Sequence, residues 1–185
     1  MNYPSAMQAV LRLDESVYPA IMAENRTVWY CVVNISVFGI LHALFSLYFS
    51  NSMMAGSPAA ESLPAASRVT IILVGVAVAF FMHAGAAMFL WVFSRGIGGN
   101  TSFFPVYFNL GISFIGLWPL APVLAAVQSG INGPAVLLLL LLVSVYALAV
   151  ILFGTKSASG LSMARMSTAM AVTIIFVTCF LYLWL

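Results

Sequence analysis

Long apolar stretches without a charged side chain dominate this sequence and decide what it can fold into. With 64% of its 185 residues apolar and 5% charged, the chain cannot bury its apolar side chains inside a water-soluble globule of this size. A helix needs about 20 mostly apolar residues to cross a bilayer, where lipid offers the backbone no hydrogen-bond partners. The sequence therefore predicts an all-α, polytopic membrane bundle of five transmembrane helices over residues 28–185. The predicted spans are residues 28–49, 69–93, 104–127, 135–153 and 166–185.

The basic residues predict how the bundle is oriented in a bacterial inner membrane. Lys and Arg gather on the cytoplasmic side of membrane proteins. A five-span topology places five of the six basic residues on one side and Arg68 on the other. We therefore expect a cytoplasmic amino terminus and a periplasmic carboxyl terminus. The five residues on the predicted cytoplasmic side are Arg12, Arg26, Arg95, Lys156 and Arg165.

Residues 1–27 form a predicted cytoplasmic segment with an amphipathic pattern. Apolar residues recur at spacings of three and four over residues 6–22, with Arg12 and Glu15 between them. This pattern predicts an interfacial helix on the inner membrane surface, bent or ended near Pro19. A second interpretation, compatible with the first, is that this helix packs under the bundle as a cytoplasmic cap.

Small residues line one face of each of the first two spans. Small side chains let helices approach closely in lipid, so both faces should point into the bundle. The faces are formed by Gly39, His42, Ala43 and Ser46 in the first span, and by Gly75, Ala79, His83 and Ala87 in the second.

Residues 94–127 join a basic, glycine-rich loop to a span that contains two prolines. Pro119 and Pro122 each remove a backbone donor and free a carbonyl, so the third span should kink or break in its outer half. The loop, residues 94–102, has two interpretations. It is either a tight solvated turn or a nest of backbone N–H groups that holds a phosphate beside Arg95.

His42 and His83 are the candidate cofactor-binding residues. Two histidines on neighbouring antiparallel spans, with small residues making room for a porphyrin, could be the axial ligands of a b-type haem. The alternative, which we favour, is that each imidazole hydrogen-bonds across the helix contact. The expected partners in that case are Ser46, Asn34 and Asn109.

The remaining reactive side chains do not indicate catalysis. Cys31 and Cys179 lie at different depths, too far apart for a disulfide, and are interpreted as small buried fillers rather than metal ligands. Ser113 has no acid to orient a base, which argues against a serine protease. All ten charged residues lie outside the predicted spans, which argues against a proton-coupled transporter.

Several short motifs resemble the YIP family, the Ypt-interacting-protein type of five-span membrane protein, in its short bacterial form. The resemblance implies five spans with a cytoplasmic amino terminus and no catalytic residues. Eukaryotic members act in vesicle traffic and bind small GTPases through longer amino-terminal regions, so GTPase binding is not expected here. The motifs are Leu-Arg-Leu-Asp-Glu-Ser-Val-Tyr at 11–18 followed by Trp29, Gly-Gly-Asn-Thr-Ser-Phe at 98–103, Leu-Trp-Pro-Leu at 117–120, Tyr146, Gly-Leu-Ser at 160–162, and Arg165.

These features predict a non-catalytic membrane scaffold, assembly factor or accessory subunit that acts through protein and lipid contacts. Arg95, Lys156 and Arg165 are the predicted contact residues for anionic head groups or a partner, each worth about 1 kcal/mol at a charged surface. Membrane lipids and other membrane subunits are the expected partners, and no nucleic acid, metal or cofactor is expected.

Two other functions stay open at this point. The first is a membrane anchor of a redox complex, with haem b held by His42 and His83. The second is a channel or transporter built around the break at Pro119 and Pro122, which predicts a water-accessible cavity.

Overall fold

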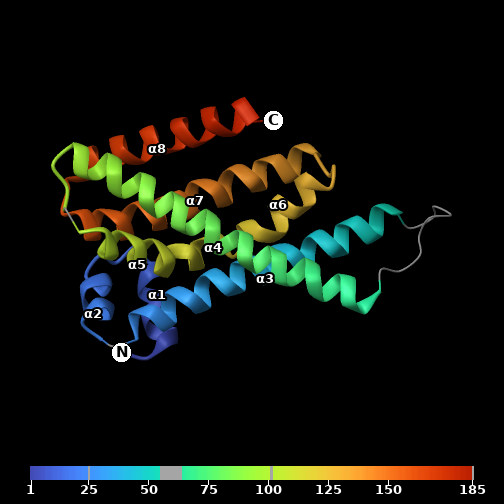
Figure 1. The fold of residues 1–185 in the computed structure, drawn as a ribbon, viewed down its shortest axis with the longest axis horizontal. Helices are drawn as coiled ribbons and strands as arrows, with labels where there is room; N and C mark the ends of the chain where they lie inside the picture. Colours follow the sequence, from blue (N-terminus) through green and yellow to red (C-terminus); the bar gives the residue numbers. More distant parts are fainter. Residues whose placement is uncertain (25, 55–63, 101, 185) are drawn as a thin grey trace.

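The computed structural model describes residues 1–24, 26–54, 64–100 and 102–184, and all regular structure in these ranges is helical (Figure 1). The predicted all-α class is therefore confirmed. The order of elements is α1 (Tyr3–Leu11), α2 (Val17–Ala23), α3 (Thr27–Met54), α4 (Ala65–Gly96), α5 (Phe103–Ser113), the 3₁₀ helix η1 (Phe114–Leu117), α6 (Leu120–Gln128), α7 (Pro134–Ser159) and α8 (Met163–Trp184).

The long helices confirm a multi-pass membrane protein. In the described chain, α3, α4 and α7 are long and apolar enough to cross a bilayer. The bent pair formed by α5–η1 and α6 adds a fourth crossing if it is one span. The described part of α8, up to Cys179, is a shorter apolar helix, and Leu185 lies outside the described residues. The predicted fifth span is thus not confirmed.

The third predicted span breaks, as its prolines indicate, and the two halves meet at 70°. The break lies between Leu117 and Leu120, in the outer half of predicted span 104–127, as predicted, and α5 passes into the 3₁₀ helix η1 before it. Pro119 is the N-cap residue of α6. A backbone N–H at this position makes no hydrogen bond within the helix, so the proline costs α6 none. The carbonyl of Ile115 accepts from the N–H of Trp118 at 3.2 Å, so the 3₁₀ turn satisfies a group that the proline would free.

Helices α3 and α4 cross closely at their small residues, as predicted. A Cβ atom placed on Gly39 would lie 2.8 Å from the Cα of Val76, and one on Gly75 would lie 2.9 Å from the Cβ of Ala43. Neither position has room for a side chain. The two small-residue faces therefore bring the helix backbones into direct contact.

The amino-terminal segment forms two helices, and the predicted break at Pro19 is wrong. The chain turns between α1 and α2, where Leu13 adopts a left-handed φ of 62°. Pro19 instead lies in the first turn of α2, a position that a helix tolerates. Both helices pack against the bundle, which confirms the cap interpretation. The buried cluster that joins them contains Ala6, Met7, Val10, Val17, Tyr18 and Ile21, with Tyr30, Ile112, Ile115 and Val150 of the bundle.

Hydrogen bonds fix this cap to the broken span. The Tyr18 hydroxyl lies 2.9 Å from the hydroxyl of Ser113, at the last residue of α5. Asn34 of α3 donates to the carbonyl of Ile112 at 2.8 Å and accepts from the hydroxyl of Tyr3. The cap is thus joined to both α3 and α5 through side chains buried in the bundle.

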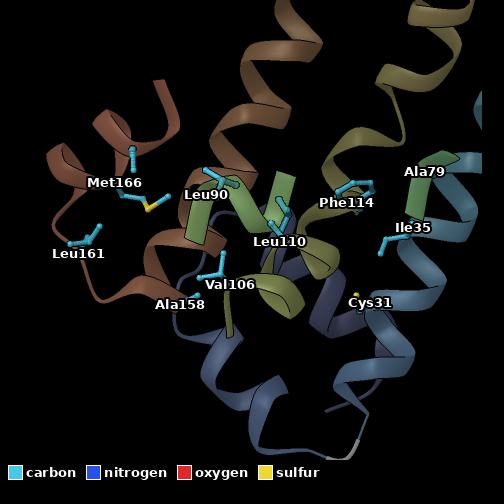
Figure 2. Close-up of a cluster of buried hydrophobic side chains, with 12 residues drawn as sticks. Cys31, Ile35, Ala79, Leu90, Val106, Leu110, Phe114, Ala158, Leu161 and Met166 are labelled. Atoms are coloured by element: carbon cyan, nitrogen blue, oxygen red, sulfur yellow. The ribbon is translucent and has the colours of Figure 1, made fainter. Parts of the chain in front are cut away.

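The bundle is packed more tightly at one end than at the other. We name the end where α4 passes to α5 and α7 passes to α8 the cation end, because it carries Arg95, Lys156 and Arg165, and the opposite end the turn end. The largest buried cluster of the described residues includes Cys31, Leu90, Leu110, Phe114 and Met166 (Figure 2). Its members come from α3, α4, α5, η1, α7, α8 and the segment between α7 and α8. Toward the turn end, by contrast, α7 exposes most of its leucines, as a helix does where lipid surrounds it.

The prediction that both cysteines are buried fillers holds for Cys31 and is wrong for Cys179. Cys31 packs in the main cluster, whereas Cys179 is exposed. The reason is that α8 packs through its first half, where Met166 and Ala169 are buried, and exposes apolar side chains such as Ile175 farther on.

We predict that Gly39→Ala lowers the free energy of unfolding by about 1–3 kcal/mol, because its methyl group would meet the backbone of α4. Unfolding in mild detergent micelles measures the effect. Gly85→Ala is the matched control, since a Cβ atom there meets nothing within 4 Å. The control should be stabilising by about 0.5–1 kcal/mol. Equal effects of the two substitutions would contradict the close crossing.

We predict that Tyr18→Ala undocks the amino-terminal cap, at a cost of about 3–5 kcal/mol, because it leaves a cavity and an unpaired Ser113. Tyr18→Phe should cost about 1–3 kcal/mol, since it removes only the hydroxyl. Protease cleavage between α1 and α2 should rise in the same order. Tyr48→Ala, whose side chain is 65% exposed, is the control and should change neither measurement. A cap that stays protease-resistant in Tyr18→Ala would refute this role.

Candidate functional site

Arg95 and Arg165 both lie at the cation end, at the ends of two different helices. Arg95 is in the last turn of α4 and Arg165 in the first turn of α8, and both side chains are exposed. Asn100 joins the α4–α5 loop to the end of α7, because its backbone N–H donates to the carbonyl of Ser159 at 2.8 Å. The Arg95 guanidinium also lies 5.4 Å from the centre of the Trp91 ring, a cation–π contact.

Lys156, the third predicted contact residue, has a partner within the chain. Its Nζ atom lies 2.6 Å from one carboxylate oxygen of Glu15 and is bonded to the other as well. The side chains of Lys156 and Glu15 are 23% and 34% exposed. This ion pair links α7 to the segment between α1 and α2, so the charge of Lys156 is largely compensated at the surface.

The described part of the glycine-rich loop, which leaves out Thr101, is a tight turn, and its backbone N–H groups do not form a phosphate nest. The N–H of Gly99 donates to the carbonyl of Ser94 at 2.8 Å, and that of Gly98 to the carbonyl of Arg95 at 3.1 Å. The N–H of Ser102 donates to the Asn100 side chain at 3.0 Å. These donors are used within the protein, so they do not converge on an anion.

His83 hydrogen-bonds to the backbone of the next helix. Its side chain is fully buried, and Nε2 lies 2.9 Å from the carbonyl oxygen of Tyr107. The ring packs edge-on against the rings of Tyr107 and Phe114. Its Nδ1 atom is buried without a hydrogen-bond partner among the described residues. His83 therefore holds α4 against α5.

His42 lies in different surroundings, on the wall of a cavity. Its Nε2 atom is 2.9 Å from the side-chain oxygen of Gln128, at the end of α6. The cavity, about 370 Å³ in volume, lies between α3, α4 and α6, and His83 is not among its lining residues. Each histidine therefore hydrogen-bonds to another helix, His42 to α6 and His83 to α5, rather than across the contact between α3 and α4. Their predicted partners, Ser46, Asn34 and Asn109, are wrong.

The haem hypothesis remains a prediction. Both Nε2 atoms are engaged by protein groups, so ligation through Nε2 would require breaking two hydrogen bonds. Among the described residues, no three His, Cys, Asp or Glu side chains gather into a group that could hold a metal ion. An absorbance spectrum of the purified protein, with His42→Ala and His83→Ala variants, tests the haem directly.

Ser113 is part of a structural network. Its hydroxyl donates to the carbonyl of Asn109 at 2.8 Å and meets the hydroxyl of Tyr18. Burial raises the pKa of Tyr18 to about 12, so this tyrosine stays protonated at ordinary pH. Asn109 in turn donates to the carbonyl of Gly154 at 3.1 Å, which ties α5 to α7.

Sequence reasoning missed three side-chain partners. They are Glu15 for Lys156, Tyr18 for Ser113 and Gln128 for His42. Glu15 and Lys156 are 141 residues apart, and Tyr18 and Ser113 are 95 apart, so no local spacing connects them. The sequence did contain a signal for Gln128. It is a polar residue at the end of an apolar helix, which makes it a candidate hydrogen-bond partner for a polar side chain of another helix.

No family model, curated protein or solved structure matches this chain. The resemblance to the YIP family therefore stays a prediction.

Proposed function

We propose that this chain is a non-catalytic scaffold, assembly factor or accessory subunit of the bacterial inner membrane, acting through protein and lipid contacts, as its resemblance to the YIP family implies. The observation that carries the proposal is the cation end. There, two arginines are exposed in the last turn of α4 and the first turn of α8, and the loop after α4 is hydrogen-bonded to the end of α7.

The chemistry of this surface suits anionic lipid head groups. A guanidinium binds a phosphate through two parallel hydrogen bonds, and both Arg95 and Arg165 are available to do so. Apolar side chains of Ile97 and Met163 are exposed beside them. Cations next to apolar groups match the boundary between head groups and acyl chains.

A catalytic role finds less support in the same geometry. The hydroxyl of Ser113 is bonded to Tyr18 and to a backbone carbonyl, and His83 is bonded to the carbonyl of Tyr107. A serine nucleophile needs a base within hydrogen-bond reach of its hydroxyl. These side chains instead join helices, as expected of a scaffold.

We also propose that the cation end faces the cytoplasm and that α8 is the fifth crossing. The basic residues favour this orientation. With 22 residues, α8 is about 33 Å long, enough to span about 30 Å of hydrocarbon.

We predict that alkaline phosphatase fused after Leu185 is active in the periplasm. The same reporter should be active at Gly130, in the turn between α6 and α7, and inactive at Gly98, in the α4–α5 loop. These two fusions are the controls. A carboxyl-terminal phosphatase that is inactive while a green fluorescent protein at the same position fluoresces would show both termini in the cytoplasm, with an even number of crossings.

We predict that Arg95→Gln and Arg165→Gln each weaken binding of phosphatidylglycerol about fivefold, since each cation contributes about 1 kcal/mol. Lipid exchange in phosphatidylcholine micelles with added phosphatidylglycerol, followed by native mass spectrometry, measures the affinity.

Two variants serve as controls for this measurement. Arg68→Gln removes a cation at the turn end and should have little effect. The double variant Glu15→Gln/Lys156→Gln removes an ion pair without changing the net charge, and should also leave lipid binding unchanged. If Arg68→Gln weakened phosphatidylglycerol binding as much as the two test variants do, that result would contradict a specific role for the cation end.

A further inference from the structure

The cavity between α3, α4 and α6 has apolar walls and polar groups at one end. Phe38 and Ala79 line its deeper part, toward the middle of the bundle. His42, Ser46 and Gln128 line the part nearer the turn end, since α3 and α6 both run toward that end. The polar side chains thus lie toward one end of the cavity on α3 and α6, whereas Ile71 and Val74 of α4 keep the facing wall apolar. An apolar cavity with a few polar groups at one end suits an amphipathic ligand.

The cavity opens sideways between the helices. Val74, Val78 and Met82 of α4 line it and are 54%, 48% and 64% exposed. Because α4 is apolar enough to cross a membrane, this opening would face hydrocarbon in a bilayer. Water has few polar partners along these walls, whereas an alkyl chain entering from the bilayer would regain the dispersion contacts that an empty space lacks.

The polar pair can recognise an acceptor oxygen. An amide oxygen can only accept, so the 2.9 Å contact with the Gln128 oxygen requires the His42 tautomer that is protonated on Nε2. The amide N–H groups of Gln128 then have no partner in the hydrogen bonds of the described residues. An ester carbonyl between a lipid's chain and its head group is an acceptor of the right kind at the right end of the cavity.

We propose that this cavity binds one acyl chain of a bilayer glycerolipid, with the ester carbonyl hydrogen-bonded to Gln128 beside His42 and the chain directed toward the middle of the bundle. The volume of about 370 Å³ lies in the range of small-molecule sites, roughly 300–1,000 Å³, which are apolar with a few placed polar groups. The site is separate from the cation end and does not depend on the role proposed for Arg95 and Arg165.

Photolabelling in vesicles tests the site. The protein is reconstituted in phosphatidylcholine that includes a phosphatidylcholine with a diazirine on one acyl chain, irradiated and digested. Residues 38–46 of α3 should be labelled more strongly than residues 137–145 of α7, which are largely exposed to lipid but line no part of this cavity.

Val78→Trp fills the opening and should reduce labelling of α3 about tenfold. This is the expected effect if the tryptophan keeps two methylene groups of the acyl chain out of the cavity. Val145→Trp is the matched control, at a position on α7 that is 59% exposed, and it should leave the labelling of α3 unchanged. Gln128→Leu should reduce labelling about fivefold through the loss of one hydrogen bond. Arg95→Gln/Arg165→Gln should label like the wild type, so a failure of the cation-end proposal is recognisable separately.

Three results would overturn the proposal. They are equal labelling of α3 and α7, equal effects of Val78→Trp and Val145→Trp, and labelling by a free diazirine fatty acid without labelling by the phosphatidylcholine probe. The last result would assign the cavity to a soluble amphiphile.

Discussion

The structure depends on satisfying backbone hydrogen bonds where the third span breaks. Lipid cannot replace a lost helical hydrogen bond, so an interrupted helix must find partners in the protein. The 3₁₀ turn supplies the N–H of Trp118 to Ile115, and Asn34 supplies its amide to the carbonyl of Ile112. A straight third helix would need neither of these two hydrogen bonds. Both therefore belong to the part of the polar network that accommodates the bend.

The same break explains why the amino-terminal helices are docked rather than free on the membrane surface. Tyr18 enters the bundle at Ser113, where α5 ends, and Gly154 of α7 leaves room for it: a Cβ atom there would lie 2.9 Å from the Tyr18 ring. Tyr146 donates to the carbonyl of Leu11, at the end of α1, at 2.7 Å. The cap therefore completes the packing of α5 and α7, and its ion pair to Lys156 follows from that position.

Local patterns in the sequence predicted local features well. Small residues at helical spacing located the α3–α4 contact at Gly39 and Gly75, and Pro119 located the break, because both effects act within one or two turns of helix. Contacts between distant segments were not predictable. Neither the pairing of Glu15 with Lys156 nor that of His42 with Gln128 follows from spacing, since each depends on how far a helix tilts or bends. The exposure of Cys179 likewise depends on the direction that α8 takes.

The bend also explains the uneven packing of the bundle. Because α6 leaves the direction of α5 by 70°, its residues Leu124 and Gln128 form one wall of the cavity, opposite the wall made by α3 and α4. A helix that continued straight would not bring Gln128 to His42. The hydrogen-bond network at the break in the third span and the open space near the turn end are thus two consequences of one interruption. The tightly packed cation end keeps its geometry because α5, before the break, remains straight among α3, α4 and α7.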